Sequence, residues 1–157
     1  IPPKKGRKHI LYIIREMLDF HPVSHKTDIA AATAYLTRVM KRRCTSFIIS
    51  DFYDDKDFEK EMEIANRKHD MVAIQVYDQR AKTMPDIGLL KVRDAETGHE
   101  MYIDTSSKKL RRAHTAYWLK REEQLKTTFA KSKVDWVSVA TNEDFAKSLI
   151  LLFKKRA

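Results

Sequence analysis

The sequence predicts an α/β domain built around a mostly parallel β-sheet. Two short apolar runs, at 45–51 and 71–77, have the length and composition of strands that are buried on both faces. A helical pattern separates them, as in a strand–helix–strand unit whose two strands run parallel. The chain has 157 residues, of which 43% are hydrophobic, so one packed core is expected.

Two helical patterns precede the first strand. The first covers 8–20, where apolar side chains recur every three or four residues and predict one buried stripe; His21 and Pro22 end it. The second follows a polar loop, and either Thr27 or Asp28 caps its N-terminus. The stripe of the first helix comprises Ile10, Ile13, Ile14, Met17 and Leu18, and the inner face of the second comprises Ile29, Ala32, Leu36, Val39 and Met40.

The helix between the two strands begins among acidic residues, which are favourable at a helix N-terminus. A right-handed crossover is expected for this unit. The acidic residues are Asp54, Asp55 and Asp57, and the expected inner face comprises Phe58, Met62 and Ala65.

The segment 84–104 breaks the alternation of strand and helix. The runs 87–92 and 101–103 predict two short strands, and Asp94-Ala95-Glu96-Thr97-Gly98 between them has the composition of a hairpin turn. We therefore expect a small β-ribbon at the margin of the sheet.

The last third of the chain predicts a long helix, one strand and a final helix. The long helix begins at Ser106 or Ser107, and the strand at 134–139 is less apolar than the others, which places it nearer an edge. Thr141 and Asp144 are expected to form the capping box of the final helix. The inner face of the long helix comprises Leu110, Ala113, Tyr117, Trp118, Leu125 and Phe129, and that of the final helix comprises Phe145, Leu149, Leu152 and Phe153.

The composition limits the classes of protein that fit. Cys44 is the only cysteine, so no intrachain disulfide can form, and a reducing compartment, the cytoplasm, is expected. No apolar stretch approaches the ~20 residues that span a bilayer. The formal net charge is +9, but the basic residues gather at predicted helix ends, where solvated charges are favourable.

Oxygen-bearing side chains follow the predicted strands. Ligands of open α/β sheets bind outside the C-terminal ends of the strands, which directs attention to Asp51, Asp54, Asp78 and the loop with Ser24 and Thr27. Mg²⁺ prefers oxygen ligands and is often held by one or two carboxylates, a chemistry that Thr27 and Asp51 suit. The ordinary alternative is that Thr27 caps a helix and Asp51 accepts hydrogen bonds from the next loop.

Several stretches of the sequence carry a resemblance to a known family. They are HKTDIAAA at 25–32, RRC at 42–44 leading into FIISDF at 47–52, and HDMVAIQV at 69–76, followed by PDIG at 85–88 and DAETG at 94–98. From about Gly6 to Arg156, the chain resembles a bacterial von Willebrand factor A-like family, a domain of unknown function commonly encoded beside MoxR-type AAA+ ATPases.

The resemblance implies a Rossmann-like, three-layer von Willebrand factor A-type fold with a metal-ion-dependent adhesion site. That site combines an Asp-x-Ser-x-Ser motif with a threonine and an aspartate, and the matching positions for the last two are Thr27 and Asp51. The motif itself does not occur in this sequence. We therefore expect residues 1–157 to be an N-terminally truncated part of the domain, which binds Mg²⁺ weakly or not at all, whereas the intact domain binds it.

The expected truncation removes neighbours of the strand at 45–51. An open edge of unpaired N–H and C=O groups would remain, through which the chain is expected to form a homodimer or to aggregate.

The predicted function is a protein–protein interaction module, not an enzyme, whose partner by resemblance is a MoxR-type AAA+ ATPase or its client. One alternative is a metal-dependent hydrolase that uses Asp51, Asp54 and Asp78, although neither a His-Glu-x-x-His motif nor a Walker A loop occurs. Another is nucleic-acid binding through the basic long helix, which we expect instead to pack its aromatic residues inward. That helix carries Lys108, Lys109, Arg111, Arg112, Lys120 and Arg121 beside Tyr117 and Trp118.

Overall fold

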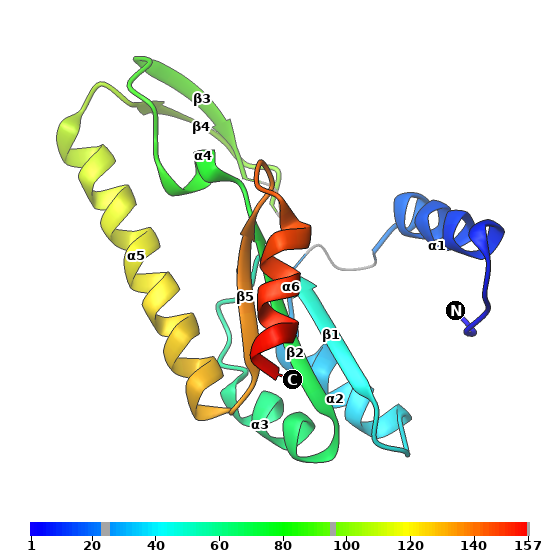
Figure 1. Cartoon of the computed structure of the whole chain (residues 1–157). Coiled ribbons are helices and arrows are strands. Elements are labelled where there is room, and N and C mark those ends of the chain that lie inside the picture. The colour runs from blue at the N-terminus through cyan, green and yellow to red at the C-terminus, as the bar shows by residue number, and fades with distance from the viewer. Residues whose placement is uncertain (23–25, 95–96, 157) are drawn as a thin grey trace.

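The fold is a parallel sheet with helices on both faces and a separate β-ribbon (Figure 1). The computed structural model describes residues 1–22, 26–94 and 97–156, so Ser24 and the centre of the expected 94–98 turn lie outside the described residues. The strands are β1 (Thr45–Ser50), β2 (Asp70–Tyr77), β3 (Leu89–Arg93), β4 (Glu100–Asp104) and β5 (Asp135–Ala140). The helices are α1 (Arg7–Asp19), α2 (Ile29–Val39), α3 (Glu59–Lys68), α4 (Gln79–Lys82), α5 (Lys108–Lys131) and α6 (Phe145–Arg156). The predicted α/β fold, with a mostly parallel sheet and a small ribbon, is confirmed at this level.

The sheet has the order β1-β2-β5, and both pairings are parallel. Its register aligns Ile48 with Ala73 and Ala73 with Trp136, and these side chains point to the same face because residues aligned on neighbouring strands share one face of the pleated sheet. That face packs against α2, α3 and α5 around the main core. The opposite face, which carries Ile74, packs against α6, and β5 lies at the predicted edge.

Aromatic rings fill the centre of the core. The Phe129 side chain is fully buried, and its ring centroid lies 5.2 Å from that of Phe52 and 5.4 Å from that of Trp136. Phe52 in turn contacts Phe58 at the start of α3. All the inner positions predicted for α3, and those predicted for α5 from Trp118 onward, are confirmed as buried; they are Phe58, Met62, Ala65, Trp118, Leu125 and Phe129.

The first helix forms as predicted, but its apolar stripe is not buried. Met17 and Leu18 are 72% and 79% exposed, and α1 stands apart from the rest of the chain (Figure 1). The helical spacing of apolar residues determines that one face is hydrophobic; it does not determine that the same chain supplies a surface to cover that face.

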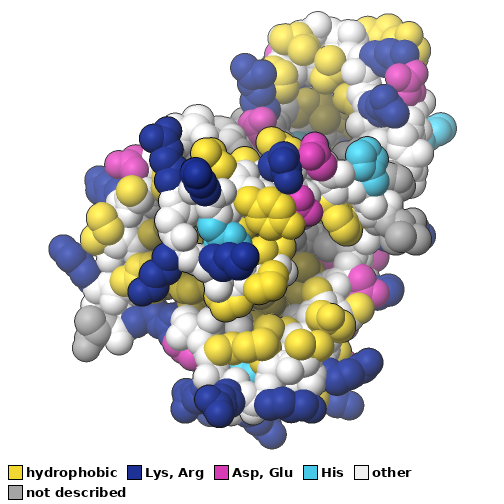
Figure 2. Space-filling view, turned by 90° about the vertical axis from the view of Figure 1, so that its right-hand side faces the viewer, with side chains coloured by type: hydrophobic (Ala, Val, Ile, Leu, Met, Phe, Trp, Pro, Cys, Tyr) yellow, Lys and Arg dark blue, Asp and Glu magenta, His cyan; other side chains and the backbone are white. Residues whose placement is uncertain are grey.

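The prediction that the first strand is buried on both faces is wrong for this chain. β1 has only β2 as a neighbour in the described sheet, and Phe47 and Ile49 are 46% and 66% exposed. The open edge expected for this strand is confirmed. Figure 2 shows hydrophobic side chains exposed on this side of the molecule.

Some predicted inner positions of the helices are also exposed. They are Ala32, Val39, Met40, Leu110, Ala113, Tyr117, Phe145 and Phe153. The capping box is replaced by a simpler cap, because α6 begins at Phe145 and the Asp144 carboxylate accepts from the Ala146 N–H at 3.0 Å.

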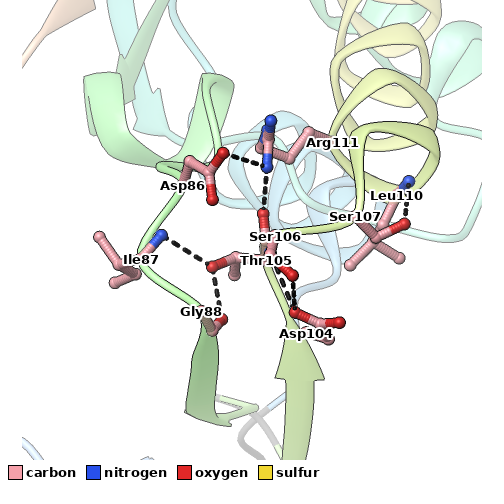
Figure 3. Close-up of polar contacts among 9 residues, drawn as sticks. All are labelled: Asp86, Ile87, Gly88, Asp104, Thr105, Ser106, Ser107, Leu110 and Arg111. Atoms are coloured by element: carbon pink, nitrogen blue, oxygen red, sulfur yellow. Dashed lines mark hydrogen bonds and ion pairs between the residues drawn. The ribbon is translucent and has the colours of Figure 1, made fainter.

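The ribbon is held at its base by Thr105, a fully buried residue (Figure 3). Its hydroxyl donates to the Gly88 carbonyl at 2.6 Å and accepts from the Ile87 N–H at 3.1 Å. Arg111 adds an ion pair with Asp86 at 2.9 Å and donates to the Thr105 carbonyl. The ribbon is therefore anchored to the start of α5. Among the described residues, no helix is both long and apolar enough to cross a membrane.

Replacing Phe129 by alanine should lower the free energy of unfolding by about 3–5 kcal/mol, since it leaves a cavity among buried rings. The matched control is Phe145→Ala, at a phenylalanine that is 65% exposed on α6, where the change should stay within about 0.5 kcal/mol. Urea denaturation followed by tryptophan fluorescence measures both, and equal losses would contradict this description of the core.

The open edge of β1 should make the chain self-associate at high concentration, and Ile49→Lys should reduce this because a charge on an edge strand opposes strand pairing. Light scattering over a concentration series measures the effect. Ile64→Lys, at an exposed isoleucine on α3, is the control and should leave self-association unchanged. A wild-type chain that stays monomeric throughout would count against edge pairing.

Candidate functional site

A tight turn at the end of β1 places Asp51 at the C-terminal end of the sheet. Phe52, the next residue, has a left-handed backbone with φ of 56°, which costs a non-glycine residue about 1–3 kcal/mol. Its fully buried ring holds it there, and the Ser50 hydroxyl accepts from its N–H at 3.0 Å. The Asp51 carboxylate accepts from the Tyr53 N–H at 2.9 Å, while the residue itself stays exposed.

The start of α2 places Thr27 and Asp28 beside this turn. Asp28 is the N-cap of α2, since its carboxylate accepts from the Ala31 N–H at 2.8 Å, which decides between the two predicted caps. Thr27, a half-buried residue, therefore lies one position before the cap.

Asp54 joins the start of α2 to the loop after β1. One of its carboxylate oxygens accepts from the Ile29 N–H at 2.8 Å and the other from the Lys56 N–H at 2.9 Å. The loop after β1 thus satisfies one of the N–H groups that the first turn of α2 leaves without a partner in the helix. This link brings the Thr27 and Asp51 segments together.

An ion pair between Asp28 and Lys56 adds a second link. The hydrogen bond from Lys56, followed by that from the Ala31 N–H, holds the pKa of Asp28 below its ordinary value of 3.8. Its stabilising contribution is thus present above that value and is lost as the pH falls through the lower pKa of the folded state. The same hydrogen bond raises the pKa of Lys56 above 10.5, so its contribution is lost only as the pH rises through that higher pKa.

Thr27 and Asp51 line one cleft of about 700 Å³. Five aspartates against two lysines give the cleft a net negative charge in a chain of net charge +9. The ribbon supplies part of the wall through Asp94 and Thr97, a contact that no local sequence pattern indicated. The lining residues are Lys26, Thr27, Asp28, Asp51, Tyr53, Asp54, Asp55, Lys56, Asp94 and Thr97.

Asp78 is not part of this cleft. It caps the short helix α4, where its carboxylate accepts from the Arg80 N–H at 2.7 Å. The structure therefore brings together Asp51 and Asp54 of the three aspartates considered for a hydrolase, and both oxygens of Asp54 already accept backbone hydrogen bonds.

The donor set suits a hard cation but is incomplete. A threonine hydroxyl and an aspartate carboxylate are ligands that Mg²⁺ accepts. Over residues 1–22, 26–94 and 97–156, however, no three His, Cys, Asp or Glu side chains converge closely enough to hold a metal ion. The residues described here therefore make at most part of a metal site.

The basic long helix uses several of its side chains within the fold. Trp118 is buried against Tyr77, whereas Tyr117 is 52% exposed, so only one of the two aromatic residues packs inward as predicted. Arg111 anchors the ribbon, and Arg121 donates to the Phe52 and Asp54 carbonyls. These contacts favour a structural use of the two arginines over a nucleic-acid surface.

Sequence patterns could have indicated part of this cleft. The acidic run from Asp51 to Asp57 directly after a strand was visible in the sequence and pointed to this loop. The contact of Arg121 with the same loop had no such signal, because it joins segments that only the folded chain brings together.

The Asp54→Ala variant should lose about 1–3 kcal/mol of unfolding free energy, because a charged acceptor is removed from two backbone N–H groups. Asp55→Ala is the matched control, at an exposed neighbour in the same loop, and should change stability by no more than about 0.5 kcal/mol. Chemical denaturation of both variants provides the comparison. If Asp54→Ala were as stable as the control, Asp54 would not be the link between α2 and this loop.

Comparison with known proteins finds relatives that share part of the chain. It is 33% identical over 108 residues to "Uncharacterized protein MAV169" of Mycobacterium avium, and the match covers 66% of this chain and 64% of that protein. It is 32% identical over 108 residues to "Uncharacterized protein Rv1480" of Mycobacterium tuberculosis and to "Uncharacterized protein Mb1516" of Mycobacterium bovis. These matches cover 66% of this chain but only 34% of each of those proteins.

No solved structure gives a significant match. The family described as "Protein of unknown function DUF58" matches residues 1–124, a range that includes both Thr27 and Asp51. The chain therefore belongs to the DUF58 family.

Proposed function

We propose that this chain is part of a von Willebrand factor A-type interaction module, in which a divalent cation held partly by Thr27 and Asp51 binds a carboxylate of a partner protein. The observation that carries the proposal is that these two residues, far apart in the sequence, line the same cleft at the C-terminal end of a parallel sheet. That is where open α/β sheets bind their ligands.

The charge of the cleft supports a cation as the bound species. Aspartates outnumber lysines among its lining residues, although the chain as a whole is basic. Thr27 would supply a hydroxyl and Asp51 a carboxylate, and the remaining ligands would come from the Asp-x-Ser-x-Ser segment that the resemblance implies. A cation in this place supplies an open coordination position for an acidic side chain of the partner.

The proposed role is binding and not catalysis. Asp54 and Asp28 are engaged in holding α2 and the loop after β1, which makes them poor candidates for a converging set of catalytic carboxylates. By the same resemblance, the partner is a MoxR-type AAA+ ATPase or its client, and the contact takes place in the cytoplasm, where ATP is present.

Mg²⁺ should bind to a chain extended at its N-terminus by the Asp-x-Ser-x-Ser segment, and both Thr27→Val and Asp51→Ala should weaken binding at least about tenfold because each removes one oxygen ligand. Isothermal titration calorimetry measures the affinities. Asp55→Ala removes a carboxylate from the same cleft without touching the proposed ligand set, so it should bind nearly as the parent does.

Two results would reject the cation site. One is the lack of Mg²⁺ binding by the extended chain. The other is an equal loss of affinity in Asp55→Ala and Asp51→Ala, which would indicate only general attraction by the acidic cleft. If Mg²⁺ binds as expected, capture of the purified ATPase in Mg²⁺ but not in EDTA tests the partner.

A further inference from the structure

Arg121 on α5 contacts three successive residues of the loop that carries Asp51. One of its terminal nitrogens, Nη2, donates to the Phe52 carbonyl at 2.8 Å and to the Asp54 carbonyl at 3.2 Å. The guanidinium carbon lies 4.1 Å from the ring centroid of Tyr53, the residue between them, within the range of a cation–π contact. One side chain from a distant helix thus contacts the whole turn that follows Asp51.

On the side that faces α2, Asp54 and Lys56 hold the loop, whereas Arg121 contacts it from the side of α5. The loop lies between the cleft that holds Thr27 and Asp51 and a second hollow of about 590 Å³ next to α5, and Asp54, Asp55 and Lys56 line both. Phe52 fixes one end through its buried ring, but its left-handed backbone must be stabilised by its surroundings. The contacts from Arg121 fall on this strained residue and on the two that follow it.

The geometry requires an arginine and not only a positive charge. A guanidinium is flat, so it can lie over an aromatic ring while its N–H groups point outward, in the plane of the guanidinium, toward carbonyl oxygens. A lysine ammonium is a compact charge and cannot make both contacts in the same way. The Arg121 Nε is buried, and no hydrogen-bond acceptor for it is found within the part of the chain that the structure describes. One donor is therefore left unsatisfied while the guanidinium keeps this position.

The pKa of Tyr53 reflects the same arrangement. Burial raises the pKa of the Tyr53 phenol above its ordinary value of 10, the neighbouring Tyr117 raises it further, and Arg121 acts in the opposite direction. The Tyr53 ring therefore lies beside two α5 residues, Tyr117 and Arg121, while part of it stays exposed to solvent.

We propose that Arg121 is the positioning residue of the cleft: by holding Phe52, Tyr53 and Asp54 in one turn, it keeps Asp51 directed at the place that Thr27 also lines. The part of this inference that concerns ligand binding rests on the proposed function of Asp51. The part that concerns the loop does not, which allows the two to be tested separately.

Hydrogen exchange of the present chain, followed residue by residue by NMR, tests the loop. The amides to follow are those of Phe52, Tyr53 and Asp54, which bond to Ser50, Asp51 and Phe52, respectively. In Arg121→Gln their exchange should be at least about tenfold faster, while the amides of the central strand β2 change only as much as global stability does. Lys120→Gln, at the exposed neighbouring position, is the matched control and should leave the loop unchanged.

Two further variants separate the contacts. Arg121→Lys keeps the positive charge but not the flat guanidinium. Of the protection that the loop amides lose in Arg121→Gln, it should restore less than half on a logarithmic scale. Tyr53→Leu removes the ring but leaves both carbonyl bonds, and should give a smaller increase in loop exchange than Arg121→Gln does. This second variant also allows the test to proceed if Arg121→Gln fails to fold.

Three outcomes would overturn the proposal. The first is hydrogen exchange of the loop amides that is unchanged in Arg121→Gln. The second is an equal increase in exchange for the loop and for β2 in that variant. The third is loop protection in Arg121→Lys that equals that of the wild type. A Mg²⁺ titration of the N-terminally extended chain then tests the link to binding, where Arg121→Gln should weaken affinity at least about threefold and Lys120→Gln should not. If the extended parent does not bind Mg²⁺, the proposed function fails, whereas the exchange data still decide whether Arg121 holds the loop.

Discussion

The buried ring of Phe52 is the contact on which both the core and the candidate cleft depend. Its side chain packs against Phe58 and Phe129 in the centre of the core. Its backbone adopts the left-handed turn that directs the preceding residue, Asp51, out to solvent at the end of β1. The free energy gained by burying a large aromatic ring offsets the strain of that turn. Core packing and site geometry are therefore joined in one residue.

Around that turn, charged side chains and their hydrogen bonds mainly hold the backbone of the loop and of α2 in place. Asp54 accepts a hydrogen bond from a backbone N–H group in the first turn of α2, Asp28 caps the same helix, and Arg121 holds the loop from the side of α5. Much of the acidic charge near the cleft is thus part of the fold, which explains why the carboxylates that the structure describes there do not form a complete metal site. Asp51 differs from Asp28 and Asp54 in lying at the solvent-exposed end of a strand.

The exposed apolar surfaces have a different origin. The hydrophobic stripe of α1 and the outer side chains of β1 are both clear in the sequence, and both remain uncovered in the fold. A periodic pattern reports only that a face is apolar, since the surface that covers it is a separate part of the molecule. These two elements show the limit of arguing burial from spacing.

The sequence by itself determined the succession of helices and strands, the parallel sheet with β5 at an edge, the ribbon, and the buried positions on α3 and the second half of α5. These features follow from local periodicity, from the length of apolar runs and from the chain geometry of strand–helix–strand units. It also indicated Thr27 and Asp51 as residues worth examining. Only the tertiary structure decided that these two share a cleft, that Asp78 lies elsewhere, and that the ribbon and Arg121 belong to the same site. The reason is physical: such contacts join segments far apart in the chain, and their formation depends on how whole elements pack rather than on any local pattern.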